Sequence, residues 1–240
     1  MKIGFLGYGE AARAFHDGLG RAVLAYDILL GADNGSMREA MKLRGASPVA
    51  IAGLAEADWV FSAVTADQSL LAVTPLLPHL RQGQVLIDIN SVSPDRKRET
   101  AAAVEAVGAQ YLDMAVMAPV HPKKHATPVL IAGKQAASLL QELIGLGFSV
   151  SMTGPEPGAA TAIKMVRSLF VKGLEAITVE TLLAARASDC FDEIYASLSS
   201  SFPGLDWARF ASYQFERTTS HGRRRAAEMR ESGATLDALG

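Results

Sequence analysis

The sequence predicts an α/β protein, in which a Rossmann-type, doubly wound sheet is followed by a smaller all-α domain. Short β-branched apolar runs alternate with longer amphipathic stretches from Lys2 to about Val150, as strands and crossover helices do. A Gly-Pro-Glu-Pro-Gly segment at 154–158 then interrupts the pattern, and every later segment has helical periodicity. We therefore divide the chain into an α/β domain, residues 1–155, and an all-helical domain, residues 156–240.

Seven apolar runs are the candidate strands of the sheet. Several are apolar on both faces, which favours parallel strands that are covered by helices on both sides. The runs cover residues 2–6, 23–26, 59–64, 85–89, 111–115, 128–132 and 148–151.

The second domain begins with a long amphipathic helix, predicted from about Gly158 to Arg186. Its apolar residues recur at steps of three and four from Ala159 onwards. Shorter helices are expected after it, over residues 189–198, 207–217 and 222–239, with a turn at 202–204. A helical domain of this size leaves much apolar surface of the long helix uncovered, so we expect a homodimer.

The composition excludes several functional classes. The 240 residues include 23 basic and 25 acidic ones, whereas nucleic-acid-binding proteins concentrate positive charge. The basic run 223–225 lies among Ala and Glu residues, so we interpret it as a solvated helix face rather than a contact with an anionic partner or a second subunit. One cysteine and no cysteine-histidine cluster argue against disulfides and a metal site. Without a signal peptide or a bilayer-length apolar run, we expect a cytoplasmic protein with no membrane partner.

A glycine-rich fingerprint connects the first strand to the first helix. It directly follows the run 2–6 and precedes a helical pattern that ends near Leu19. Gly7 allows a tight turn, Gly9 lets the backbone approach a pyrophosphate, and Ala12 lets the helix pack closely on the strand. The predicted dinucleotide-binding residues are Gly7, Tyr8, Gly9, Glu10, Ala11 and Ala12.

An acidic residue at the end of the second strand indicates which dinucleotide binds. Asp27 follows Gly7 by twenty positions, where a carboxylate accepts hydrogen bonds from the adenosine ribose and repels a 2′-phosphate. We therefore predict NAD rather than NADP, although Arg13 or Arg38 could reach the same region. The alternative interpretation is a structural glycine turn with a surface aspartate.

Four motifs, in this order, resemble the β-hydroxyacid dehydrogenase family, which includes 3-hydroxyisobutyrate and 6-phosphogluconate dehydrogenases. They are Gly7-x-Gly9-x-x-Ala12, Asp27, Asp88-Ile89-Asn90-Ser91-Val92-Ser93-Pro94 and Gly158-x-x-x-x-x-Lys164. The resemblance covers roughly residues 1–186. The later helices resemble a bacterial subgroup described only as 6-phosphogluconate-dehydrogenase-like. The resemblance implies a nicotinamide-dependent oxidoreductase with its active site between two domains.

In this family a lysine on the long interdomain helix is the general acid and base, and Lys164 matches its position. The resemblance implies that Lys164 exchanges a proton with the substrate oxygen while hydride passes to or from the nicotinamide. The amine needs a pKa near neutrality, which burial or a cationic neighbour such as Arg167 would provide. Arg167 and Ser168 stand where the family commonly has two asparagines, and they are candidate substrate-binding residues.

A second departure from the family follows the strand 111–115. The family's carboxylate-binding Ser-Gly-Gly aligns with Met117-Ala118-Pro119, in which Met117 has no hydroxyl and Pro119 has no backbone N–H. The donor-rich run from His121 to His125 comes next and is either an anion site or a solvated loop. A metal pair from these histidines is disfavoured because no carboxylate completes it. Met117, Ala118 and His121 are therefore candidate substrate contacts.

Further residues near the strand ends complete the predicted site. Ser91 aligns with a family hydroxyl near the nicotinamide, Val64 and Thr65 end a strand beside the cofactor crevice, and Asn90 faces cofactor or substrate. Two histidines without an acid-base partner are assigned packing or surface roles, His16 and His79. Aromatic residues of the second domain are assigned to a core or a dimer interface, namely Phe202, Trp207, Phe210, Tyr213 and Phe215.

Together these features predict an NAD(P)-dependent dehydrogenase or reductase that acts on an alcohol or carbonyl compound carrying an acidic group. A small-molecule substrate and a second copy of the chain are the expected partners. One alternative is an imine reductase, because imine reductases share this fold and differ chiefly at the position of Lys164. Another is a catalytically silent NAD(H)-binding regulator, which the departures at Met117 and Pro119 favour.

Overall fold

The computed structural model describes residues 1–31 and 35–240, with the side chain of Arg224 excepted. The described residues form one eight-stranded sheet in the order β3-β2-β1-β4-β5-β6-β7-β8. Its strands are β1 Ile3–Leu6, β2 Val23–Tyr26, β3 Ala46–Pro48, β4 Trp59–Ser62, β5 Val85–Asp88, β6 Gln110–Val116, β7 Val129–Ala132 and β8 Val150–Gly154. All neighbouring pairs are parallel except β6 and β7. The doubly wound fold class is confirmed.

The seven predicted strands are all present, and two features of the sheet were not predicted. The three-residue strand β3 was missed, because only Ala46 in it is buried and Pro48 is unusual in a strand. The antiparallel pairing of β6 with β7 also departs from the expected parallel pattern. The connection between them contains only the short 3-10 turn Lys124–Ala126, and no crossover helix, which a parallel neighbour would require.

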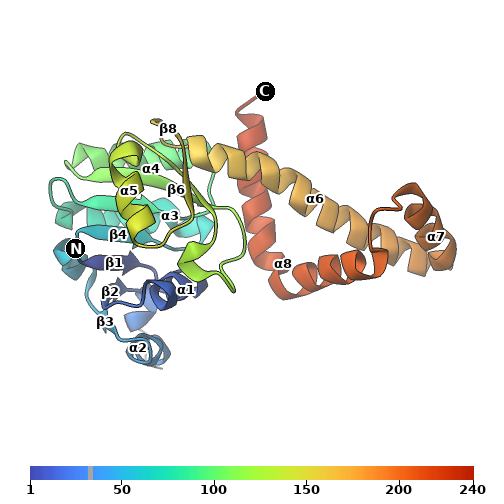
Figure 1. The fold of residues 1–240 in the computed structure, drawn as a ribbon, viewed down its shortest axis with the longest axis horizontal. Coiled ribbons are helices and arrows are strands. Elements are labelled where there is room, and N and C mark those ends of the chain that lie inside the picture. Colours follow the sequence, from blue (N-terminus) through green and yellow to red (C-terminus); the bar gives the residue numbers. More distant parts are fainter. Residues whose placement is uncertain (32–34) are drawn as a thin grey trace.

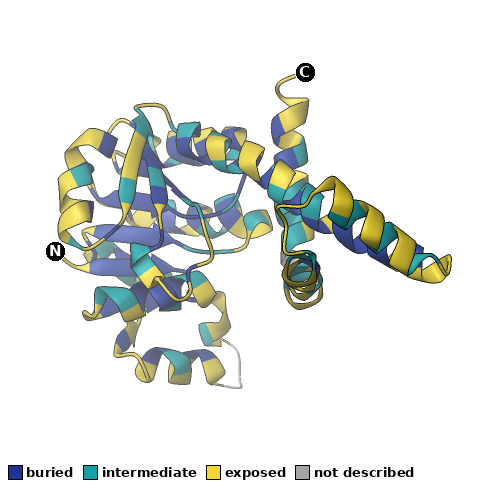
Figure 2. Cartoon of the chain, turned by 45° about the vertical axis from the view of Figure 1, so that its right-hand side comes forward, coloured by how far each residue is buried: buried dark blue, intermediate teal, exposed yellow. Residues whose placement is uncertain are grey.

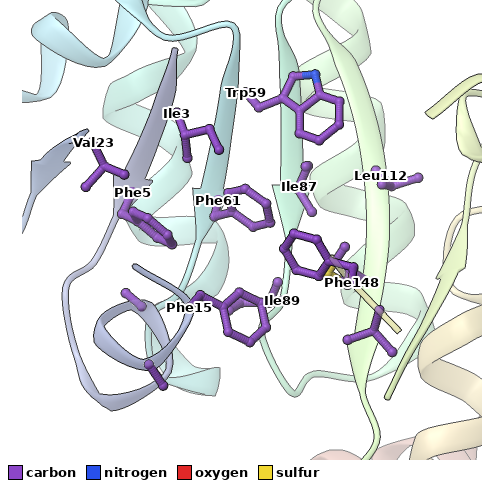
Figure 3. Close-up of a cluster of buried hydrophobic side chains, with 14 of the residues drawn as sticks. Ile3, Phe5, Phe15, Val23, Trp59, Phe61, Ile87, Ile89, Leu112 and Phe148 are labelled. Carbon is purple, nitrogen blue, oxygen red and sulfur yellow. The ribbon is translucent and has the colours of Figure 1, made fainter. Parts of the chain in front are cut away.

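Helices cover both faces of the sheet (Figure 1). They are α1 Glu10–Leu19, α2 Ser36–Lys42, α3 Ser69–Val73, α4 Pro94–Ala106 and α5 Ala136–Gly145, with short 3-10 turns between them. Alternate strand residues enter two separate cores: Phe61 lies in the core with Phe5 and Phe148, and its neighbour Val60 lies in the other. Phe61 stacks on both aromatic partners, with ring centroids 5.4 and 5.9 Å apart (Figure 3).

Three helices form the C-terminal part, namely α6 Ala159–Ala187, α7 Phe191–Ser201 and α8 Trp207–Asp237. The long helix α6 confirms its prediction. The predicted break between 217 and 222 is wrong, because α8 is one continuous helix. Figure 1 shows that α8 instead bends, so that it first runs back toward the sheet and then crosses α6 near its start. Gly222 is at the middle of α8, two residues after Ser220, and helices often bend where glycine and serine lie close together.

Aromatic side chains hold the corner between α7 and α8. The Trp207 ring lies 5.7 Å from Phe210, 6.2 Å from Phe202 and 6.4 Å from Tyr195, measured between centroids. The predicted packing role therefore applies to Trp207 and Phe210, which are partly buried, whereas Phe202 stays 54% exposed although its ring contacts Trp207. Outward faces of α6 and α8 remain exposed, in contrast to the buried strands of the sheet (Figure 2).

Polar contacts join the helical part to the sheet at its carboxyl edge. Asp113 Oδ2, on β6, accepts hydrogen bonds from the backbone N–H groups of Gly158 and Thr161, both at 3.1 Å, and so caps the start of α6. Glu231 of α8 accepts a hydrogen bond of 2.8 Å from the backbone N–H of Ser93. The chain changes from strand to helix between Gly154 and Ala159, while the division into domains at residue 155 stays a prediction.

Within the described part of the chain, no helix is long and apolar enough to cross a membrane.

Candidate active site

A cleft of about 280 Å³ lies between the carboxyl edge of the sheet, α6 and α8. In an open α/β sheet, this edge is where ligands bind, outside the ends of the strands. The sheet side of the cleft is formed by the start of α1 and the loops after β5 and β6, through Glu10, Ala11, Ile89, Ser91, Val116, Met117, Ala118, Pro119 and Val120. The helical side is formed by Lys164, Arg167, Ser168, Val171, Lys172, Glu175, Tyr213, Arg217, His221, Arg225 and Glu228.

The glycine fingerprint has the geometry that a dinucleotide requires. Gly7 has φ +86°, and a Cβ there would lie 2.6 Å from the carbonyl oxygen of Ala63. A Cβ on Gly9 would meet nothing within 4 Å, so open space lies over this backbone at the start of α1. Ala12 is fully buried, which allows the close packing of α1. The residues present therefore fit a pyrophosphate group.

Tyr8 contributes only its backbone to this region. Its side chain is fully buried, its hydroxyl lies 2.6 Å from Nδ1 of His16, and burial raises the pKa of the tyrosine to about 12. His16 is also buried, its Nε2 lies 3.0 Å from the carbonyl oxygen of Arg21, and burial lowers its pKa. The packing role expected for His16 is confirmed, and His79 is exposed.

Asp27 lies directly beside the fingerprint. Its Oδ2 accepts a hydrogen bond of 2.7 Å from the backbone N–H of Tyr8, and its Oδ1 accepts one of 3.0 Å from Leu29. A carboxylate has further lone pairs with which it can accept bonds from ribose hydroxyls. Of the two arginines considered, Arg13 donates to the carbonyl oxygen of Tyr8 at 2.9 Å, whereas Arg38 lines a second cavity beyond β2.

Lys164 and Ser91 meet at the centre of the cleft. Lys164 Nζ donates a hydrogen bond of 2.6 Å to Ser91 Oγ, and the lysine side chain is half-buried. Burial is the largest cause that lowers the pKa of Lys164, to about 8, and the positive charges of Lys97 and Lys172 lower it further against the opposing effect of Glu228.

Arg167 is not the cation that lowers this pKa. Its side chain is exposed, so water screens its charge, and the cations that act on Lys164 come from α4 and from two turns further along α6. Arg167 and Ser168 nevertheless line the cleft with Lys164, as their shared helix face predicts.

Three of the residues predicted near the strand ends do not line the cleft, namely Asn90, Val64 and Thr65. The Asn90 side chain is 3% exposed, its Oδ1 accepts a bond of 2.7 Å from the backbone N–H of Val64, and its Nδ2 donates to Ser62 Oγ at 2.9 Å. Asn90 therefore fixes the loop after β4 and does not face a ligand. Val64 lies against Gly7 beside the fingerprint, and the exposed Thr65 bonds to Asp67 and lowers the pKa of that carboxyl.

The donor-rich run after β6 also departs from its prediction. Met117, Ala118 and Pro119 line the cleft, but His121 is exposed and does not. The run packs against α1 and the segment after α5 instead: Lys124 Nζ donates to the carbonyl oxygen of Asp17 at 3.4 Å, His125 Nε2 lies 3.1 Å from the carbonyl oxygen of Leu146, and the His125 ring packs against Phe148. Among the described residues, no group of three His, Cys, Asp or Glu side chains is placed to hold a metal ion.

One complete wall of the cleft was missed in the sequence. Residues 213, 217, 221, 225 and 228 are spaced by one helical turn, so they share a face of α8. This pattern is visible in the sequence, but the expected break after residue 217 concealed it. Tyr213 belongs to this wall and is 51% exposed, so it is not a core residue, and its alternative assignment to a dimer interface stays a prediction.

Two ion pairs attach this wall to α6. Arg225 makes a forked contact with the Glu175 carboxylate, and Lys172 Nζ lies 3.1 Å from Glu228 Oε2. The Arg225 side chain is 13% exposed, so the interpretation of the run 223–225 as a solvated face is wrong for this residue. It is buried because Glu175, on the facing helix, neutralises its charge.

Known families match both parts of the sequence. Residues 2–144 match the NAD-binding domain of 6-phosphogluconate dehydrogenase. Residues 185–240 match a domain of unknown function, DUF1932.

Several known proteins are similar to nearly the whole chain. A conserved hypothetical protein from Sinorhizobium meliloti is 36% identical, with a TM-score of 0.77, over 100% of this chain and 83% of its own. A conserved protein of unknown function, described as similar to 3-hydroxyacid dehydrogenases, is 28% identical, with a TM-score of 0.76, over 100% and 91%. An uncharacterized 28.5 kDa protein from Methanothermus fervidus is 25% identical over 96% of this chain and 89% of its own.

Enzymes of lower identity share the fold. A 3-hydroxyisobutyrate dehydrogenase from Salmonella typhimurium is 19% identical, with a TM-score of 0.73, over 100% of this chain and 88% of its own. An imine reductase from Myxococcus stipitatus, solved with NADP+, is 19% identical, with a TM-score of 0.67, over 92% and 78%. With the fingerprint, the cleft at the carboxyl edge of the sheet and the family match in agreement, the chain belongs to the family of the NAD-binding domain of 6-phosphogluconate dehydrogenase.

Proposed function

We propose that this protein is an NAD-dependent dehydrogenase or reductase that acts on an alcohol or carbonyl compound carrying an acidic group. The observation that carries the proposal is Lys164, whose amine reaches Ser91 at 2.6 Å in the cleft and has a pKa lowered to about 8. Such an amine exchanges protons near neutral pH, as a general acid and base must.

The fingerprint residues would hold the dinucleotide. Gly7 and Gly9 shape the turn, the N-terminal amides of α1 would bind the phosphates, and Asp27 would accept hydrogen bonds from the adenosine ribose. When bound, the nicotinamide supplies the site from which hydride leaves or to which it is added. The Asp27 carboxylate repels a 2′-phosphate and is the basis for our preference of NAD over NADP.

Lys164 handles the proton of the reaction. In the oxidation direction, its neutral amine takes the hydroxyl proton of the substrate; in the reduction direction, its ammonium returns a proton to the carbonyl oxygen. Ser91 holds Nζ at the sheet edge, and capping of α6 by Asp113 fixes the first turns of the helix that carries Lys164. Arg167 and Ser168, one turn on, offer donors to an acidic group close to the reacting carbon.

The proposal includes a homodimer. Four large apolar side chains on α6, exposed by 48, 52, 73 and 62%, are spaced by three, four and seven residues, namely Ile163, Val166, Phe170 and Ile177. A stripe of this kind matches a second copy of itself across a two-fold axis.

The test is a substrate screen with a matched pair of variants. Hydroxy acids, hydroxy dicarboxylic acids, phosphorylated hydroxy acids and amino alcohols are offered with NAD, and formation of NADH is followed by absorbance. We expect Lys164→Met to lower kcat/KM by about a hundredfold or more, as loss of a general acid or base does. Lys42→Met, an exposed lysine on α2, serves as the control and retains full activity.

Two further measurements, reduction of cyclic imines with NADH and calorimetry of NAD binding, address the alternatives. Reduction of cyclic imines that survives Lys164→Met would indicate an imine reductase. NAD binding by calorimetry without turnover of any compound would indicate a silent regulator, for which Met117 and Pro119 in the cleft are the supporting observation.

A further inference from the structure

The charges on the helical side of the cleft are not balanced. Lys172 forms an ion pair with Glu228, and Arg225 forms one with Glu175. Arg217 lines the same wall and forms no ion pair with any described carboxylate, and its Nε is buried without a hydrogen-bond partner among the described atoms. A buried guanidinium nitrogen without an acceptor costs free energy, so the site favours a ligand that supplies one.

The neighbours of Arg217 on this wall are also hydrogen-bond donors. Tyr213 and His221 lie one turn before and one turn after it, and both line the cleft. The adjacent acid in the sequence, Glu216, is exposed and does not line the cleft. This stretch of α8 therefore presents donors without a competing carboxylate, the arrangement that recognises an oxyanion.

Arg217 lies far from the reacting end of the cleft. Ser232 Oγ of α8 lies 3.6 Å from Sδ of Met165, the residue after Lys164, so Ser232 marks the level of Lys164 on α8. Arg217 precedes Ser232 by fifteen residues, which is about 22 Å along the helix axis, or less across the bend. A simple β-hydroxy acid is too short to reach both places.

We propose that Arg217, with Tyr213 and His221, binds an anionic group of the substrate, a carboxylate or a phosphate, several bonds away from the carbon that reacts at Lys164. The proposal rests on the proposed function only in taking this ligand to be a substrate. It also explains how an acidic compound is held in a cleft where Met117 and Pro119 offer neither a hydroxyl nor an N–H.

The test measures binding of inorganic phosphate and of glutarate by calorimetry, with NAD present so that the fingerprint is filled. We expect Arg217→Met to weaken binding of at least one probe by about tenfold or more, and Arg217→Lys to weaken it less, since lysine keeps the charge but not the fork. Arg223→Met, an exposed arginine of the same helix outside the cleft, is the matched control. Circular dichroism confirms that each variant is folded.

Each outcome decides the question. Equal binding by Arg217→Met and Arg223→Met, or no binding of either probe to the unaltered protein, would overturn the proposal. A preference for phosphate or for glutarate identifies the chemistry of the group. A failed substrate screen together with Arg217-dependent anion binding would refute the proposed function alone.

Discussion

At the scale of the residue, the lowered pKa of Lys164 predicts opposite pH dependences for the two directions of the reaction. Oxidation needs the neutral amine, so kcat/KM should rise with pH and level off above about 8. Reduction needs the ammonium, so its rate should fall above the same pH. Rates measured from pH 6 to pH 10 check this expectation. An unchanged profile in Lys164→Met would assign the transition to another group.

Substitution of two glycines of the fingerprint should separate an effect on stability from an effect on NAD binding. Gly7→Ala places a Cβ 2.6 Å from the carbonyl oxygen of Ala63 at φ +86°, so we expect the free energy of unfolding to fall by about 2 kcal/mol or more. Gly9→Ala meets no atom within 4 Å, so stability should change by less than about 0.5 kcal/mol. The same Cβ fills the open space over α1 and should weaken NAD binding by about tenfold.

Urea unfolding and NAD calorimetry on the two variants give the comparison. If Gly9→Ala bound NAD as tightly as the unaltered protein, the pyrophosphate would have to lie elsewhere. If Gly7→Ala were fully stable, the turn after β1 would not depend on its left-handed conformation.

At the scale of the element, two buried ion pairs between α6 and α8 determine where the second wall of the cleft stands. Arg225→Met leaves the Glu175 carboxylate unpaired. Because the Glu175 side chain is only 6% exposed, we expect the free energy of unfolding to fall by about 3–5 kcal/mol. The double variant Arg225→Met with Glu175→Met removes both charges and should recover most of this loss. Urea unfolding measures both, with Arg223→Met as the exposed control. A double variant as unstable as the single one would show that packing, rather than charge, holds α8.

Elements whose identity depends on local pattern were predictable from the sequence. The strand β1, the glycine turn and the helix α6 each follow from a run of neighbouring residues. The site residues Lys164 and Ser91 were found because their motifs resemble those of the β-hydroxyacid dehydrogenase family. The wall on α8 was not found for two reasons. The Ser-His-Gly sequence at 220–222 is typical of a helix break, and Glu175, the partner of the buried Arg225, is fifty residues away in the chain.

Polar side chains were the least predictable part of the site. Asn90 and His121 both suit a ligand by residue type, yet backbone geometry buries one beneath the loop after β4 and turns the other outward. Which side of a turn a polar residue occupies depends on contacts far apart in the chain. Sequence patterns do not record them.

At the scale of the whole molecule, the apolar stripe on α6 predicts association of two copies. Phe170, the most exposed residue of the stripe at 73%, is expected to lie in the interface, so Phe170→Asp should convert a dimer into a monomer. Light scattering coupled to size exclusion gives the masses. Leu71→Asp, at a residue 65% exposed on α3, is the matched control and should leave the dimer intact. A protein that is monomeric before any substitution would remove the homodimer from the proposal.

The positions of the two tryptophans allow the parts of the molecule to be observed separately by fluorescence. Trp59 lies in β4 within the sheet core, and Trp207 lies in the aromatic corner at the start of α8. Trp207→Phe leaves an emission that reports only on the sheet, and Trp59→Phe leaves one that reports only on the corner. Heating curves from the two variants would coincide if the chain melts as one cooperative unit, and would separate if residues 156–240 unfold on their own.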